Sequence, residues 1–171
     1  MWKYTGTERP PFAITPRPGQ ESVWDYSRPP KIVPDDRRVV VRFDDLTIAD
    51  SVHTVRVLET ASPPTFYIPE SDVKVELLQP ARGDSLCEWK GRAAYWTLKT
   101  AELPQGVIGW SYATAEAPYE SISGYYSFYP GRIDCFVNGQ CVRPQPGSFY
   151  GGWVTDEIVG PWKGDPGTEK W

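Results

Sequence analysis

Residues 38–59 read RVVVRFDDLTIADSVHTVRVLE and indicate three short strands in succession. β-Branched residues fill 38–43, an Asp-Asp pair follows, and apolar residues then recur over 46–50 and 54–59. Only a few residues separate these runs, which is too short for the helical crossover that parallel strands require. The stretch therefore predicts antiparallel β-structure.

The same spacing continues along the chain, with proline or glycine in nearly every gap. Further strands are expected at 65–68, 73–78, 92–99, 107–112, 125–129 and 132–137. The one helix expected is 117–124, with Pro118 at its first position and Gly124 closing it. We therefore expect a mainly β protein, a single compact antiparallel domain that is tent-like or barrel-like, with one short helix.

Composition divides the chain into three segments. Residues 1–36 are rich in proline but carry aromatic side chains, which predicts an extended arm that packs on the domain or on a partner. Residues 37–143 form the β domain. Residues 144–171 are rich in glycine, proline and aromatics, and we expect this extension to pack on the sheet or on a neighbouring subunit.

Size and charge narrow the function classes. The 171 residues suffice for one domain with a core, and the net charge of −4 argues against a protein that binds nucleic-acid backbones. No apolar run approaches the ~20 residues of a membrane span, and the N-terminus lacks the apolar region of a secretory signal. We expect a cytoplasmic monomer or homodimer that binds neither nucleic acid nor membrane.

The three cysteines fit a reducing compartment. Asn138 and Gly139 predict a two-residue hairpin turn in which Phe136 opposes Cys141. Cys135 and Cys141 then point to opposite faces, so we expect free thiols.

Few catalytic or metal motifs are present. The only histidine, His53, lies in a polar turn and has no matching nucleophile motif. The cysteines lack zinc-ligand spacing, and neither glycine-rich nucleotide fingerprint occurs. No metal site and no cofactor are therefore expected.

Glu59 is the first candidate for chemistry. Alternation places it on the face of Val55 and Val57, at the end of the strand. A partly desolvated carboxylate there suits a general base or a hydrogen-bond acceptor for a ligand. The alternative is that the strand ends at Leu58 and Glu59 is solvated.

The segment CEWKGRAAYW, residues 87–96, is the second candidate. Lys90 lies at a turn into a strand, where alanines leave room beside Tyr95 on one face and Trp96 on the other. Lys90 would hold an anionic group, and Cys87 would be a nucleophile if activated. The alternative is a surface lysine, a structural cysteine and core aromatics.

Asp72 either binds a ligand or accepts hydrogen bonds within its turn. Glu59 and Lys90 are the candidate catalytic residues. The candidate ligand-binding residues are Tyr67, Asp72, Cys87, Tyr95, Trp96 and Trp110.

Four blocks together resemble a bacterial family known as domain of unknown function 427: ETASPPTFYIPESDVKVELLQP, CEWKGRAAYW, GWSYATAEAPYESISGYYSFYPGRID and PGSFYGGWVT. The resemblance covers residues 37–137 and implies a compact all-β domain without an established reaction. The family is sometimes labelled nucleotidyltransferase-like, but this chain lacks the Gly-Ser followed by Asp-x-Asp that such transferases use to hold metal and triphosphate. The positions that match the family blocks are Glu59, Pro64, Tyr67, Pro69, Asp72, Cys87, Lys90, Gly91, Tyr95, Trp96, Trp110, Tyr112, Gly124 and Phe128.

We therefore expect a pocket for a small polar metabolite, with Glu59 as base if there is a reaction and Lys90 as partner of an anionic group. One alternative is a non-enzymatic interaction module that uses the two extensions. Another is nucleotidyl transfer. The sequence does not decide whether the protein is an enzyme.

Overall fold

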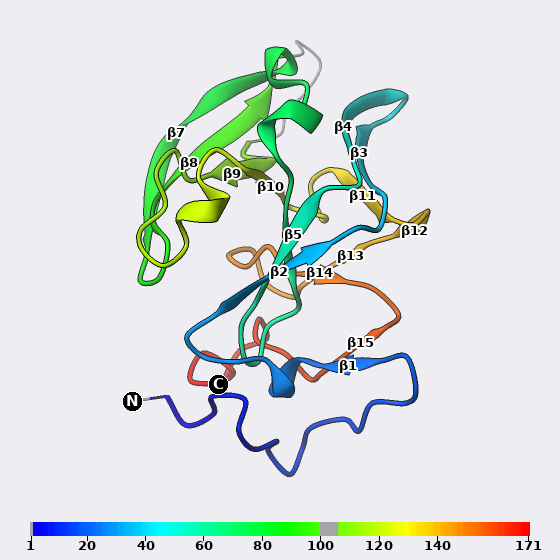
Figure 1. Cartoon of the computed structure of the whole chain (residues 1–171), viewed down its shortest axis with the longest axis vertical. Coiled ribbons are helices and arrows are strands. Elements are labelled where there is room, and N and C mark those ends of the chain that lie inside the picture. Colours follow the sequence, from blue (N-terminus) through cyan, green and yellow to red (C-terminus); the bar gives the residue numbers. More distant parts are fainter. Residues whose placement is uncertain (1, 100–105) are drawn as a thin grey trace.

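A computed structural model describes residues 2–99 and 106–171. The described residues form a mainly β fold of short strands in several sheets, as predicted (Figure 1). The strands are Glu21–Ser22 (β1), Lys31–Asp35 (β2), Val39–Phe43 (β3), Leu46–Ser51 (β4), Thr54–Leu58 (β5), Thr65–Tyr67 (β6), Leu78–Cys87 (β7), Gly91–Leu98 (β8), Gly109–Ser111 (β9), Tyr126–Phe128 (β10), Asp134–Val137 (β11), Gln140–Cys141 (β12), Arg143–Pro144 (β13), Trp153–Val154 (β14) and Ile158–Val159 (β15).

Three sheets make up the centre of the fold. Their strand orders are β12-β11-β3-β4, β2-β5-β6 and β10-β9-β8-β7, with antiparallel neighbours throughout. Ile68 and Tyr126 exchange two backbone hydrogen bonds of 2.8 Å and so connect the second sheet to the third. None of these sheets closes on itself within the described residues. The predicted barrel-like form is therefore not observed.

The hairpin of β11 and β12 confirms the predicted register. Asn138 and Gly139 both have positive φ, as a tight hairpin turn requires, and Phe136 opposes Cys141. Cys135 is fully buried, Cys141 is exposed, and both are free thiols.

The predicted strand at 73–78 is wrong. Residues Glu70–Asp72 (η2) and Val75–Leu77 (η3) form short 3-10 turns, and the strand begins only at Leu78. The long strand β7 was not predicted because Pro80 and Gly83, which lie within it, are residue types that usually mark turns. A shift of register between Pro80 and Asp84 accommodates them within the pairing with β8.

The predicted helix at 117–124 is reduced to one 3-10 turn, Glu120–Ile122 (η4); another such turn is Val23–Asp25 (η1). Contacts with residues distant in sequence, and not helical propensity, determine the conformation of this segment. The Tyr119 hydroxyl donates to the Pro30 carbonyl, and Ile122 is fully buried. Gly124, with φ of +77°, ends the turn and donates its N–H to Tyr112.

Both extensions pack on the same chain. Strand β2 pairs with β5, β1 runs parallel to β15, and the two chain ends lie in the same lower part of the molecule (Figure 1). The Trp24 side chain is fully buried near the N-terminus. Trp153, also fully buried, stacks on Phe66 at 4.8 Å between ring centres. The extensions thus supply core residues.

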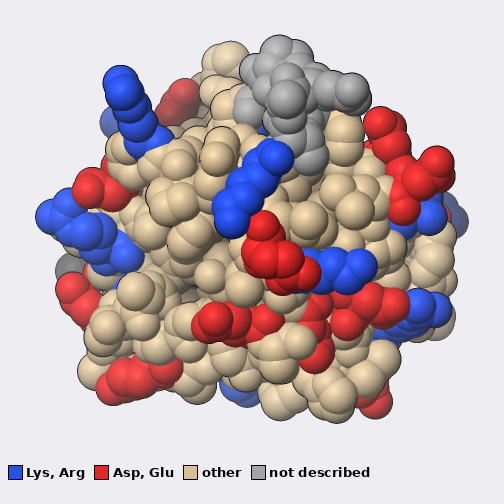
Figure 2. All heavy atoms as spheres, turned by 90° about the horizontal axis from the view of Figure 1, so that it is seen from above, with Lys and Arg blue, Asp and Glu red and all other residues tan. Residues whose placement is uncertain are grey.

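Surface charges of both signs are mixed. On the face shown in Figure 2, basic and acidic side chains lie near one another and no single sign dominates. Exposed ion pairs of the chain include Arg38 with Asp50 and Arg92 with Asp84. Among the residues that the structure describes, no helix is long and apolar enough to cross a membrane.

Candidate functional site

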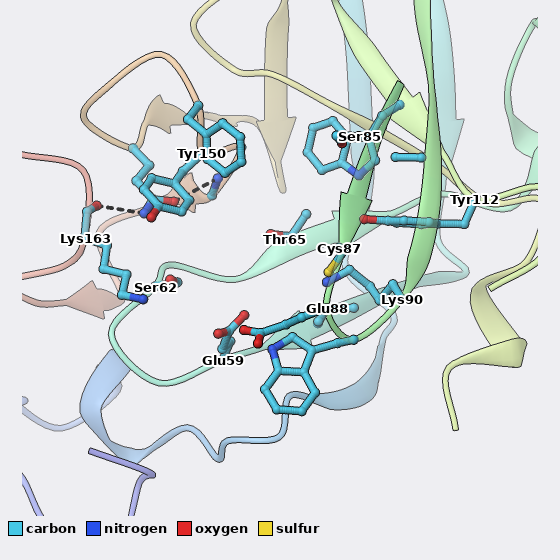
Figure 3. A pocket seen from close by; sticks show the side chains of 18 of the residues that line it. Glu59, Ser62, Thr65, Ser85, Cys87, Glu88, Lys90, Tyr112, Tyr150 and Lys163 are labelled. Atoms are coloured by element: carbon cyan, nitrogen blue, oxygen red, sulfur yellow. Dashed lines mark hydrogen bonds between the residues drawn. The ribbon is translucent and has the colours of Figure 1, made fainter. Parts of the chain in front are cut away.

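A cavity of about 410 Å³ lies where the sheet of β7, β8 and β9 faces β5, β6 and the C-terminal extension (Figure 3). This volume suits a small molecule. The lining residues include Trp2, Val57, Glu59, Ser62, Thr65, Tyr67, Leu86, Cys87, Glu88, Trp89, Lys90, Tyr95, Trp110, Tyr112, Tyr129, Gln145, Phe149, Tyr150, Gly151 and Lys163.

Glu59 enters the cavity one residue beyond β5. The strand ends at Leu58, yet alternation still places Glu59 on the side of Val57, which is buried and lines the same cavity. The Glu59 side chain is 24% exposed and accepts a hydrogen bond from Arg28 Nε at 3.2 Å. It is therefore an ion-paired carboxylate at the cavity wall and not the solvated residue of the alternative interpretation.

Lys90 occupies the turn between β7 and β8. Gly91, with φ of +87°, allows the tight connection, as predicted for this turn. The Lys90 residue is only 8% exposed, and Cys87 is one of the neighbours that act on its pKa. Among the described residues Lys90 has no carboxylate within ion-pair distance.

Burial works against the charge of Lys90 and lowers its pKa. Tyr67 and Cys87 raise it when they are ionised, Glu59 also raises it, and the net shift of the Lys90 pKa is upward. At neutral pH, where the Tyr67 phenol is protonated, Glu59 is the carboxylate that favours the ammonium form of Lys90. In this form Lys90 can bind an anion but cannot serve as a base.

A group of aromatic side chains lies beside Lys90, whose Nζ is 5.9 Å from the centre of the Tyr112 ring. Trp110 Nε1 donates to the Tyr67 hydroxyl at 3.2 Å, and the rings of Tyr67 and Tyr112 lie 6.3 Å apart between centres. Burial raises the pKa of both tyrosines. Both phenols are therefore neutral at physiological pH and can donate hydrogen bonds to an oxygen of a ligand.

Trp89 adds a donor without a partner. Its indole Nε1 is shielded from solvent and has no hydrogen-bond partner among the described residues, although the residue lines the cavity. Buried indole N–H groups ordinarily find an acceptor. A ligand oxygen in the cavity would supply one.

The structure brings together six of the eight predicted site residues. Those at the cavity are Glu59, Lys90, Tyr67, Cys87, Tyr95 and Trp110. Trp96, on the other face of β8, donates from Nε1 to Ser111 Oγ at 2.8 Å and packs against the main core. Asp72 lies in η2, where it accepts from Ser51 Oγ at 2.6 Å. Neither Trp96 nor Asp72 reaches the cavity, and the roles of the other six remain predictions.

Several lining residues were not predicted, among them Trp2, Trp89, Gln145, Tyr150 and Lys163. Lys163 had a usable signal. The tripeptide Trp-Lys-Gly occurs twice, at 89–91 and at 162–164, and both of its glycines have positive φ. Both lysines of this repeated tripeptide line the same cavity.

No metal-binding group is evident within residues 2–99 and 106–171, where no three His, Cys, Asp or Glu side chains gather suitably. The polar groups of the cavity are amines, carboxylates, phenols, indoles, hydroxyls, a thiol and an amide.

The fold and the site define a small mainly β protein with an aromatic-walled polar pocket. The model of a family described as domain of unknown function (DUF427) matches residues 31–139, which is well over half of the chain. The chain belongs to that family, as the sequence blocks predicted. The match includes Glu59 and Lys90 but neither Trp2 nor Lys163. No curated protein matches the chain.

Proposed function

We propose that the cavity binds a small polar metabolite with an acidic group, which pairs with the ammonium group of Lys90. The observation that carries this proposal is Lys90 itself. A buried lysine without a carboxylate within ion-pair distance among the described residues is costly unless an anion joins it. The indole N–H of Trp89 is a second unpartnered donor for the same ligand.

The walls favour a ligand with a flat or apolar body next to its acidic group. Trp110 and Tyr129 are in contact at 4.5 Å between ring centres, and Tyr67 lies edge-on to Trp110. Two apolar residues that line the cavity are largely exposed to solvent, Leu86 by 76% and Phe149 by 73%. Apolar surface at these positions would be covered by such a body.

Glu59 is the base if the pocket is catalytic. Lys90 remains charged, and the two neighbouring phenols remain protonated, so these groups would stabilise negative charge on a substrate while a carboxylate takes the proton. Arg28 orients Glu59 through their ion pair.

A thermal-shift screen tests the proposal. The panel holds small carboxylates, phosphomonoesters, aromatic acids, and nucleoside triphosphates with Mg²⁺; uncharged analogues serve as controls. A ligand at 100 times its Kd adds about 2.7 kcal/mol, which for a chain of this size raises Tm by roughly 5–10 °C.

Lys90→Met should abolish the shift, whereas Lys74→Met, at an exposed lysine, should preserve it. A panel in which no acid stabilises the wild-type protein would contradict the proposal. Stabilisation by nucleoside triphosphates alone, dependent on Mg²⁺, would favour nucleotidyl transfer.

A further inference from the structure

Lys163 is a second lysine in the cavity, contributed by the C-terminal extension beyond the matched family region. The residue is 5% exposed. Its backbone N–H donates to the Ala61 carbonyl at 2.8 Å, and its carbonyl accepts from Gln145 Nε2 at 2.7 Å. These two hydrogen bonds fix the backbone of Lys163 at the cavity wall.

The amine of Lys163 lies close to a second positive charge. Its Nζ is 4.3 Å from the centre of the Trp2 ring, and the guanidinium carbon of Arg28 is 4.1 Å from the same ring centre. The contact with an indole ring favours the ammonium form of Lys163. Burial and the charge of Arg28 act against that form and lower the pKa of Lys163. A negative charge beside the amine would offset both effects.

Lys90 and Lys163 share one property, a buried amine without an anionic partner. Both residues line the cavity, and among the residues that the structure describes neither has a carboxylate at ion-pair distance. The two carboxylates of the cavity do not fill this role. Glu59 is paired with Arg28 at 3.2 Å, and Glu88 is exposed to solvent. Two buried positive charges therefore lack a partner, which is costly unless a ligand supplies the negative charge.

The two amines are too far apart to share one acidic group. Figure 3 shows Lys163 and Lys90 on opposite sides of the view, with Ser62, Thr65 and Glu59 between them. The carboxylate of Glu59 would also repel an acidic group placed in the middle of the cavity. The arrangement therefore favours a ligand with negative charge at its two ends and none at its centre.

We propose that the cavity binds a dicarboxylate, with one carboxylate paired to Lys90, the other paired to Lys163, and an uncharged apolar spacer between them. This inference rests on the proposed function, because it names the class of ligand for the same pocket. The cavity volume of about 410 Å³ admits a molecule of that size. The spacer lies against the wall that Tyr67 and Trp110 form.

Isothermal titration calorimetry of the full-length protein tests this inference. The probes are the α,ω-dicarboxylates from succinate to sebacate, each compared with the monocarboxylate of the same chain length. A second charged hydrogen bond should make the best dicarboxylate bind about tenfold to a hundredfold more tightly than its monocarboxylate. The affinity of the dicarboxylates should peak at one spacer length, whereas that of the monocarboxylates should only rise with apolar length.

Two lysine variants and one control assign the two ends. Lys163→Met should bring the ratio of dicarboxylate to monocarboxylate affinity close to one, because the second pairing is lost. Lys90→Met should weaken both kinds of acid. Lys170→Met, at an exposed lysine of the same extension, should leave the ratio as in wild type. A merely structural role of Lys163 would lower both affinities and preserve their ratio.

The outcomes separate this inference from the proposed function. A dicarboxylate preference that depends on Lys163 supports both. Binding of monocarboxylates through Lys90 without a dicarboxylate preference, or with a preference that survives in Lys163→Met, overturns the inference and leaves the anion pocket standing. If Lys163→Met fails to fold, the wild-type series decides, and the absence of a peak in spacer length overturns the inference. Absence of binding by either series overturns it as well, and the wider panel of acids then decides the proposed function.

Discussion

Arg28 Nε lies 3.2 Å from Glu59 Oε1, and this ion pair joins the N-terminal extension to the wall of the pocket. The Arg28 side chain is 1% exposed. It also donates to the Thr60 carbonyl at 2.7 Å and to an oxygen of Trp171 at 3.2 Å. Arg28 thus holds the last residue of the chain and the candidate base in one arrangement.

Replacing Arg28 should destabilise the protein strongly. Arg28→Met leaves Glu59 without its ion-pair partner and should lower the free energy of unfolding by about 3 kcal/mol. Urea denaturation measures the change. Arg38→Met is the matched control, because its pair with Asp50 is exposed and should be worth less than ~1 kcal/mol. Equal losses in the two variants would refute the structural role given to Arg28.

A methyl group at Gly151 should disturb the aromatic wall. A Cβ there would lie 2.3 Å from a ring atom of Trp110, so Gly151→Ala must displace the indole at a cost of about 1–3 kcal/mol. Tryptophan fluorescence and urea denaturation report the change. At Gly106 a Cβ meets nothing within 4 Å, and Gly106→Ala should alter stability by less than ~1 kcal/mol. Indistinguishable behaviour of the two variants would count against the packing described.

The pocket tyrosines should resist ionisation at high pH. Burial raises the pKa of Tyr67 and Tyr112, so above about pH 10 the unfolded state loses protons that the folded state keeps. The free energy of unfolding should therefore fall as the pH rises through this range. Phenolate absorbance should show fewer than the ten tyrosines titrating before the protein unfolds. Titration of all ten in the folded state would contradict the burial of this cluster.

Asp35 should contribute to stability above the acid range. Burial raises its pKa, but hydrogen bonds and charge from Arg37, with the charge of Arg56, lower it by more. Stability from this group is present above the ordinary carboxyl pKa of about 3.9 and is lost as pH falls through the lower folded value. Asp35→Asn should therefore show a smaller loss of urea stability than wild type between pH 7 and acid. If the difference in urea stability between wild type and Asp35→Asn is the same at pH 7 and at acid pH, Asp35 makes no such contribution.

Short sequence patterns predicted those strands and turns whose conformation is determined by residues close together in the sequence. Asn138-Gly139 fixes a hairpin by its own backbone preferences, and β3 to β6 follow from short β-branched and apolar runs between turn residues. Partners distant in sequence decide the failures. Residues 75–77 have a strand pattern but form a 3-10 turn, and η4 is held by the Tyr119 bond to Pro30.

The site divides in the same way. Glu59 and Lys90 could be predicted from local sequence. Alternation along a strand gives the side to which Glu59 points, and the turn before the next strand gives the position of Lys90. Trp2 and Lys163 reach the cavity only because both extensions fold back on the domain, and no local pattern encodes that path. The repeated Trp-Lys-Gly tripeptide was the one local clue to Lys163.

The indole resonances of the eight tryptophans give the most direct test of the central claim, that an acidic ligand occupies the pocket beside Lys90. On addition of phenyllactate to ¹⁵N-labelled protein, the indole N–H signals of Trp89 and Trp110 should shift, while those of buried Trp24 and Trp153 stay in place. Lys90→Met should remove the response. Shifts confined to Trp24 and Trp153, or no shift with any acid of the panel, would contradict the account.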